Sequence, residues 1–173
     1  MSSEILTLVG VILLLILASA FFSSAETALT AASDARMRQL AGKGNRRARL
    51  VERLRDDREG LIGSILIGNN AVNVIASALA TSVFISVLDD AGVLWATITM
   101  TVILVVFAEV MPKTYALTYS DKYALAIAPA VRVVVIVLSP LSIALRMLAS
   151  SLIRKQDTGC LLYTSDAADE GVR

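Results

Sequence analysis

The chain has 173 residues, of which 56% are apolar and only 5% aromatic, and its formal net charge is +1. With a mean hydropathy of +0.72, this composition excludes an ordinary water-soluble core and indicates a membrane protein. The sequence contains no histidine, so a metal ion would have to be held by oxygen ligands. It also offers no nucleophile beside a base, and we therefore expect that the protein is not an enzyme.

The first predicted membrane span begins at Ile5, and its uncharged run ends at Phe22. These 18 residues would form about 27 Å of helix at roughly 1.5 Å per residue, enough to cross a membrane with help from the flanks. A signal peptide is the alternative, because residues 18–20 (ASA) look like a cleavage site. Glu4 and the absence of Lys or Arg before the run argue against it, so we favour a membrane span.

Residues 33–60 form a basic segment of helical propensity, with nine Lys and Arg residues against five Asp and Glu residues. Positive charge beside membrane spans marks the cytoplasmic side. Nucleic-acid binding is the alternative, but no aromatic residues interleave with the arginines. We therefore place this segment in the cytoplasm and expect no nucleic-acid partner.

Two further apolar runs follow, at residues 61–88 and 93–108. The first of them carries the polar sequence GNNAVN at residues 68–73 and is closed by two aspartates, while the second ends at Glu109. With the basic segment inside, three spans put the N-terminus outside and the C-terminal side in the cytoplasm.

Residues 123–153 are apolar enough for a fourth span, but Arg132 lies in the middle and Pro140 follows. A crossing here would carry Arg154 and Lys155 to the outside, against the charge rule. We therefore expect a pair of helices along the inner surface, with snorkelling arginines. A fourth span is the open alternative.

The end of the chain differs from the rest. The sequence CLLYTSDAADE at residues 160–170 resembles the translated end of a transposase adapter used in preparing sequencing libraries. We therefore expect residues 1–155 to form the membrane domain and residues 156–173 to be a non-native or disordered tail. On this interpretation the natural protein is interrupted near Thr158, before its regulatory domains.

A cation site is predicted where the third apolar run ends. The carboxylate of Glu109 at the edge of a span is costly without a partner. Pro112 lacks an N–H and crowds the carbonyl four residues earlier, that of Ala108, which becomes free to bind an ion. Oxygen donors also lie on the other spans, at Ser23, Ser24, Asn69, Asn70 and Asn73. The alternative is that these serines and asparagines only join the helices by hydrogen bonds.

Three segments resemble the signature motifs of one family, the CorC and cyclin M (CNNM) magnesium transporters: FFSSAETAL, LIGSILIGNNAVNVIASALAT and FAEVMPKTYAL. With ALAIAPAVR, the resemblance covers roughly residues 5 to 155. It implies an all-α membrane fold of three transmembrane helices plus interfacial juxtamembrane helices. One departure is Ala108, where the family most often has glycine.

The resemblance also implies a function and a site. It implies a homodimer that transports Mg²⁺ across the bacterial inner membrane, with Na⁺-coupled export and with ATP acting through regulatory domains outside this sequence. Family-like ligands would be Ser23, Asn70 or Asn73, and Glu109, with Pro112 shaping the bend. The alternative function is a membrane anchor that senses Mg²⁺ for the regulatory domains.

Overall fold

The computed structural model describes residues 2–153, and every element in this part of the chain is a helix. In chain order they are α1 (Ser2–Ala31), α2 (Asp34–Gly42), α3 (Arg46–Asp56), α4 (Arg58–Leu88), η1 (Asp89–Ala91), α5 (Gly92–Ile103), η2 (Leu104–Val110), α6 (Met111–Thr118) and α7 (Ser120–Ile153). The predicted all-α fold is confirmed. The predicted boundary at residue 155 and the tail beyond it lie outside the described residues.

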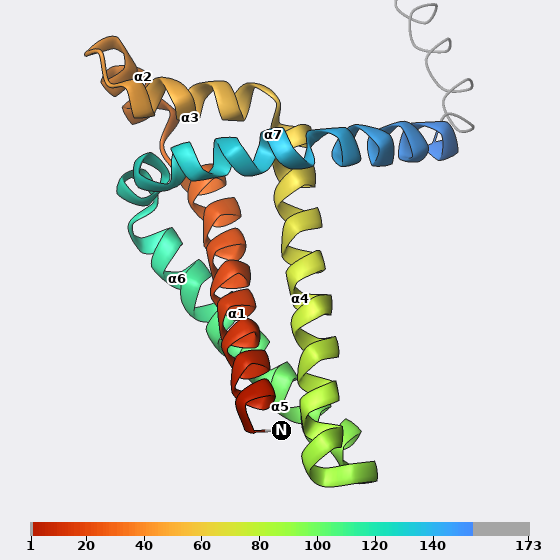
Figure 1. The fold of residues 1–173 in the computed structure, drawn as a ribbon. Helices are drawn as coiled ribbons and strands as arrows, with labels where there is room; N and C mark the ends of the chain where they lie inside the picture. Colours follow the sequence, from red (N-terminus) through yellow and green to blue (C-terminus); the bar gives the residue numbers. More distant parts are fainter. Residues whose placement is uncertain (1, 154–173) are drawn as a thin grey trace, which may run out of the picture.

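Three legs of the structure run side by side (Figure 1): α1, α4, and the succession α5–η2–α6. Three stretches are long and apolar enough to cross a membrane, namely Ser3–Ala31, Arg58–Thr118 and Ser120–Leu145. The second of these contains two legs, because η1 turns the chain back from α4 into α5. Many large apolar side chains on the legs are exposed, as expected for surfaces that face lipid. The chain is therefore a multi-pass membrane protein.

Helix α7 qualifies as a span by length and composition, but its direction indicates another role. Figure 1 shows it crosswise over the ends of α1 and α4, close to the basic helices α2 and α3. A helix that lies across the ends of the spans runs along the membrane surface. This arrangement agrees with the predicted interfacial position and not with a fourth span.

The predicted pair of helices in this region is wrong, because α7 is one continuous helix of 34 residues with Pro129 and Pro140 inside it. An internal proline costs roughly 3 kcal/mol in a helix. Here α7 buries a continuous face made by Ala124, Ile127, Ala128 and Val131, and this packing holds the helix together across Pro129.

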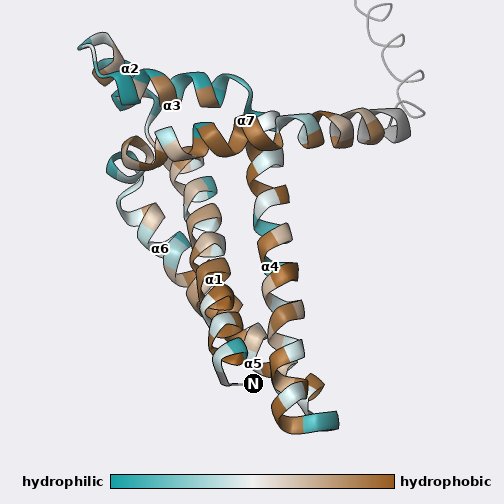
Figure 2. Cartoon of the chain, viewed as in Figure 1, coloured by the Kyte–Doolittle hydropathy of each residue, from teal (hydrophilic) through white to brown (hydrophobic). Residues whose placement is uncertain are grey.

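The basic segment forms two short helices because each has its own cap. The side chain of Ser33 accepts the N–H of Arg36 at the start of α2, and Asn45 accepts the N–H groups of Arg47 and Ala48 at the start of α3. Gly44, with φ of +90°, makes the turn between them, a conformation that glycine adopts without strain. Figure 2 shows these helices as the hydrophilic part of the molecule.

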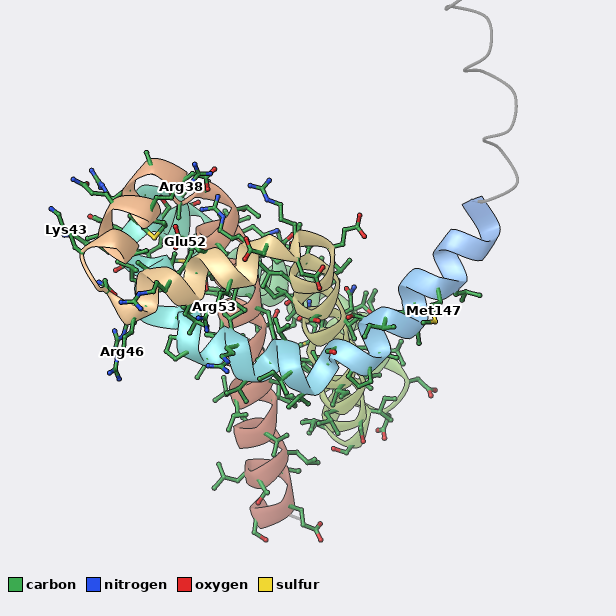
Figure 3. All side chains as sticks on the ribbon, turned by 90° about the horizontal axis from the view of Figure 1, so that it is seen from above. Arg38, Lys43, Arg46, Glu52, Arg53 and Met147 are labelled. Atoms are coloured by element: carbon green, nitrogen blue, oxygen red, sulfur yellow. The ribbon has the colours of Figure 1, made fainter. Side chains whose placement is uncertain are left out.

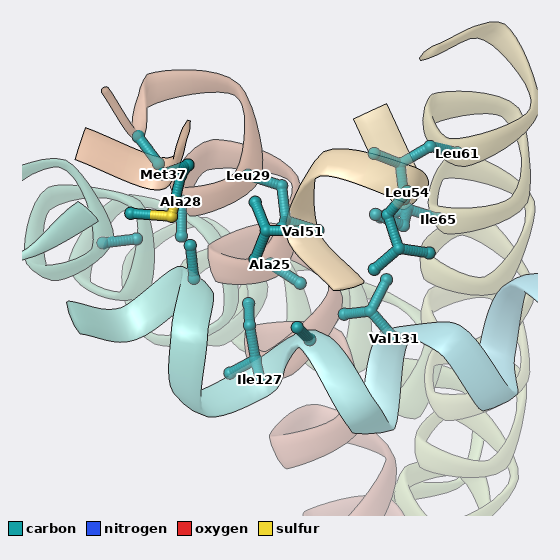
Figure 4. Packing of buried hydrophobic residues seen from close by; sticks show 14 residues of the cluster. Ala25, Ala28, Leu29, Met37, Val51, Leu54, Leu61, Ile65, Ile127 and Val131 are labelled. Carbon is teal, nitrogen blue, oxygen red and sulfur yellow. The ribbon is translucent and has the colours of Figure 1, made fainter. Parts of the chain in front are cut away.

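Two buried apolar clusters hold the helices together. The larger joins α1, α2, α3, α4, α6 and α7 at the end of the bundle where α7 lies (Figure 4); it includes Ala25, Leu29, Met37, Val51, Leu61, Ala116 and Val131. The smaller joins α1, α4, α5 and η2 deeper among the legs, through Ile12, Ile16, Ala76, Ala80, Met100 and Ala108. Each cluster marks a level along the helices, and polar residues next to a cluster in sequence lie near that level.

The topology predicts a labelling pattern. After Cys160 is replaced by serine, single cysteines at Lys43, Asp90 and Arg154 are to be tested with a membrane-impermeant thiol reagent. We expect Lys43 and Arg154 to react from one side of the membrane and Asp90 from the other, because η1 and α2 lie at opposite ends of the legs. Opposite labelling of Lys43 and Arg154 would instead show that α7 crosses.

Candidate cation site

The third leg changes its helical form at the predicted site. Between α5 and α6, residues Leu104–Val110 form a π-helix, which contains Ala108 and Glu109. The N–H of Met111 donates to the carbonyl of Val106, five residues back, as in a π-helix. Such segments are rare and are frequent at functional sites. Sequence analysis predicted a break here through Pro112 but not this form.

Pro112 has no N–H to donate, so one backbone carbonyl upstream loses its hydrogen bond. The π-helix changes which carbonyl this is. If the register of the Met111 bond continued, the N–H of residue 112 would serve the carbonyl of Phe107, and in an ordinary α-helix it would serve Ala108. Because proline has no N–H, neither the carbonyl of Phe107 nor that of Ala108 receives the hydrogen bond that residue 112 would otherwise donate. Sequence analysis named only Ala108.

Ala108 is completely buried and belongs to the smaller apolar cluster with Ile12, Ile16 and Ala76. The methyl group of Ala108 is therefore part of the packing of this cluster. Glu109 is the next residue and is half-buried. The carboxylate thus lies at the depth of this cluster, well inside the legs.

The two predicted serine ligands differ in their hydrogen bonding. The Ser24 hydroxyl donates to the carbonyl of Phe21 at 3.0 Å and lies 2.9 Å from the hydroxyl of Tyr123 on α7. The hydroxyl of Ser23 is buried and has no hydrogen-bond partner among the described residues. Of these two hydroxyls, that of Ser23 is the one without a hydrogen bond among the described residues.

The three asparagines of α4 also differ. Asn69 accepts a hydrogen bond from the hydroxyl of Ser19 on α1, at 2.9 Å. Asn70 is exposed, whereas Asn73 is half-buried and its Oδ1 has no partner among the described residues. Because Asn69 and Asn73 are one turn apart, they share a face, and the bond to Ser19 shows that this face meets α1. In the sequence, the spacing of four residues between Asn69 and Asn73 already indicated that both lie on one face of the helix.

The Ser19–Asn69 bond also sets the register of α1 against α4, which run in opposite directions. Asn73 is four residues after Asn69 on α4, and Ser23 is four residues after Ser19 on α1. Because the two helices run in opposite directions, the two residues lie on opposite sides of this bond, each about 6 Å from it along its helix axis at roughly 1.5 Å per residue. One ion could not contact Ser23 and Asn73 together across about 12 Å. The structure does not bring these two predicted ligands to one point.

Glu109 and Asn73 both lie close in sequence to residues of the smaller apolar cluster. Ala108, the neighbour of Glu109, belongs to the buried cluster that also contains Ile12, Ile16 and Ala76, and Ala76 is three residues beyond Asn73 on α4. A buried polar atom without a partner costs about 1–3 kcal/mol. The orphan oxygen of Asn73 is therefore free to meet a cation, and it flanks the same cluster as the carboxylate of Glu109.

In the part of the chain that the structure describes, no three Asp, Glu, Cys or His side chains converge. A cation bound here would therefore meet one carboxylate and several neutral oxygens. Sequence analysis also missed the hydroxyl of Tyr123, which holds Ser24, because residues 99 positions apart give no local pattern.

Comparison with known proteins gives one family and several relatives. The family is described as the cyclin M transmembrane N-terminal domain, and it matches residues 10–166. The UPF0053 inner membrane protein YfjD of Escherichia coli is 47% identical over 106 residues, which cover 61% of this chain and 25% of that protein. A UPF0053 protein of Haemophilus influenzae is 39% identical over 116 residues, 67% of this chain and 28% of that protein.

A chloroplastic DUF21 domain-containing protein of Arabidopsis thaliana is 37% identical over 116 residues, which cover 66% of this chain and 18% of that protein. The chain thus spans about a quarter of the length of the two bacterial relatives. The similarity concerns the membrane domain.

Proposed function

This chain belongs to the cyclin M (CNNM) transmembrane-domain family, and from that premise we propose that it transports a divalent cation, Mg²⁺, across the membrane. The observation that carries the proposal is the buried Oδ1 of Asn73, which has no partner among the described residues and lies three residues from the apolar cluster that Ala108, the neighbour of Glu109, also joins. We assign these two residues to the ion, with the carbonyls of Phe107 and Ala108 beside them.

Mg²⁺ suits this set of donors. It binds oxygen, prefers an octahedral arrangement at about 2.0–2.1 Å, and usually keeps several of its waters. A position with one carboxylate and a few neutral oxygens can therefore hold it partly hydrated. One negative charge does not neutralise a divalent ion, so release remains possible, as transport requires.

Ser23 suits a second position on the route of the ion through the protein. Its orphan hydroxyl lies about two turns from Asn73, toward the end of the bundle where α7 lies. We propose that Ser23 meets the ion after it leaves the Asn73 level, on the cytoplasmic side. Ser24 and Asn70 stay predicted ligands, the former already bonded to Tyr123 and the latter exposed.

A homodimer in the bacterial inner membrane is part of the proposal. Its support is Asn70, an amide exposed on an apolar leg of the single chain, because polar groups facing lipid are unfavourable. A second copy could cover this amide. Na⁺ as coupling ion, and export as direction, follow from the family resemblance alone.

Flux measurements separate transport from the alternative, a Mg²⁺-sensing membrane anchor. The protein is reconstituted into liposomes that contain a Mg²⁺-sensitive dye, and external Mg²⁺ is added with and without an opposing Na⁺ gradient. We expect dye signals above those of protein-free liposomes. Binding of Mg²⁺ to this chain without any flux would favour the sensor.

A further inference from the structure

A hollow of about 390 Å³ lies between α3 and α7. Five arginines line it, together with one apolar residue: Arg46, Arg47, Arg49, Leu50 and Arg53 from α3, and Arg132 from α7. All five arginines are exposed. Figure 3 shows Arg53 on the side of α3 that faces α7 and Arg46 at the start of α3.

These arginines have no carboxylate partners in the described part of the chain. The ion pairs there join Arg36 to Asp121 at 2.8 Å and Arg55 to Asp34 at 3.0 Å. None of the arginines that line the hollow takes part in them. Five like charges around one hollow repel one another, and an anion from outside would relieve the repulsion.

A neighbouring hollow shows that this arrangement is not general to the basic helices. That hollow, of about 530 Å³ between α2 and α3, also has five arginines, but three carboxylates lie among them: Asp34, Glu52 and Asp56. The lining of that hollow carries a net charge of +2, against +5 beside α7, although Arg49 and Arg53 line both hollows. The hollow beside α7 combines several arginines with no acidic residue, which none of the three other hollows lined by Asp34, Tyr115 or Ser120 does.

The position of the hollow identifies the anion. Helix α7 lies along the membrane surface, and the residues next to Arg132 include the exposed apolar side chains of Val133, Ile136 and Val137. The arginines are therefore at the level of lipid headgroups, with acyl chains beside them. We propose that this hollow binds the phosphate group of an anionic phospholipid, which ties α3 to α7. The proposal does not depend on which ion the protein carries.

The test uses the whole chain, purified in a non-ionic detergent, with lipid retention measured by native mass spectrometry. The ligands are phosphatidylglycerol, phosphatidylcholine and inorganic phosphate. We expect retention of phosphatidylglycerol, weak retention of phosphatidylcholine, and no competition by phosphate at equal concentration. Each arginine near a membrane surface contributes about a fivefold gain in affinity, so Arg46→Gln with Arg132→Gln should weaken phosphatidylglycerol binding about 25-fold.

The matched control is Arg38→Gln with Arg58→Gln, which removes the same charge from exposed positions in the hollow between α2 and α3 and leaves the arginines beside α7 intact. It should leave phosphatidylglycerol binding nearly unchanged. Equal weakening in both double variants would overturn the proposal in favour of a diffuse surface charge. Equal retention of phosphatidylcholine, or full displacement by inorganic phosphate, would also overturn it, because the hollow would then not select an anionic lipid.

Discussion

Glu109→Gln is expected to abolish Mg²⁺ transport and to weaken Mg²⁺ binding by more than about a hundredfold. Two opposite unit charges 4 Å apart near a protein surface attract by about 4 kcal/mol, and about 1.4 kcal/mol is a factor of ten. Glutamine keeps the shape of the side chain and loses this attraction. Calorimetric titration gives the affinity, and the liposome assay gives the flux.

Glu26→Gln is the matched control, because Glu26 is also a half-buried carboxylate on a membrane leg. Its removal should leave Mg²⁺ binding unchanged. Loss of a neutral oxygen, in Ser23→Ala, Asn70→Ala or Asn73→Ala, should weaken binding by about tenfold or less, since water can take its place. If Glu109→Gln retains the affinity of the unmodified chain, or if Glu26→Gln loses as much, the assignment of Glu109 is wrong.

The Glu109→Gln protein is expected to fold normally. In the described part of the chain Glu109 has no ion pair, and removing such a carboxylate from a membrane interior relieves a cost. An unchanged elution volume on size-exclusion chromatography therefore separates a binding defect from misfolding.

Gly92→Ala should destabilise the protein by about 1–3 kcal/mol, the range for overpacking. Gly92 is buried where η1 turns α4 into α5, and a Cβ there would lie 2.5 Å from the backbone nitrogen of Ile85 and 2.6 Å from its Cα. Backbone atoms of a long helix cannot move aside as a flexible side chain can. We expect a thermal midpoint in detergent lower by roughly 3–10 °C.

Gly10→Ala provides the control for this substitution. Gly10 lies inside α1, and a Cβ there would meet nothing within 4 Å. Because alanine is a better helix former than glycine by about 1 kcal/mol, this variant should be as stable as the unmodified chain or slightly more so. A Gly92→Ala protein with an unchanged thermal midpoint would show that the α4–α5 turn is less tightly packed than described.

Much of the fold could be predicted because apolar run length and charge position decide it. The uncharged run after Ile5 became α1, and the basic segment became α2 and α3 beside the membrane. Arg132 and Pro140 argued against a fourth span, and the crosswise direction of α7 agrees with that argument. The same two residues also predicted two helices where α7 is one continuous helix. The burial of Ala124, Ile127 and their neighbours holds α7 together, and this burial depends on contacts with residues distant in sequence.

The candidate site could be predicted only in part. Residue type was enough to single out Glu109 and the asparagines, since ionisable and amide groups are unusual in apolar spans. Choosing among neighbouring asparagines needs the direction in which α4 faces α1, which the Ser19–Asn69 bond reveals. The direction of Asn69 and Asn73 and the exposure of Asn70 therefore come from the structure alone.

The π-helix could not be read from the sequence for a different reason. Pro112 predicts disturbed hydrogen bonds upstream, but the form of the disturbance depends on the packing of the leg. Here Ala108 is held against α1 in a buried cluster while Met111 bonds to Val106. The helix propensities of individual residues do not include this packing constraint.

The central claim is that one cation is held at the level of Asn73 and Glu109, and locating a bound ion tests it most directly. Mn²⁺ binds the same hard oxygen ligands as Mg²⁺ and gives an anomalous X-ray signal in crystals of the protein. We predict an anomalous peak within about 2.5 Å of Asn73 Oδ1 and of a Glu109 carboxylate oxygen. A peak that contacts neither residue, or a peak that persists in crystals of Glu109→Gln, would contradict the claim.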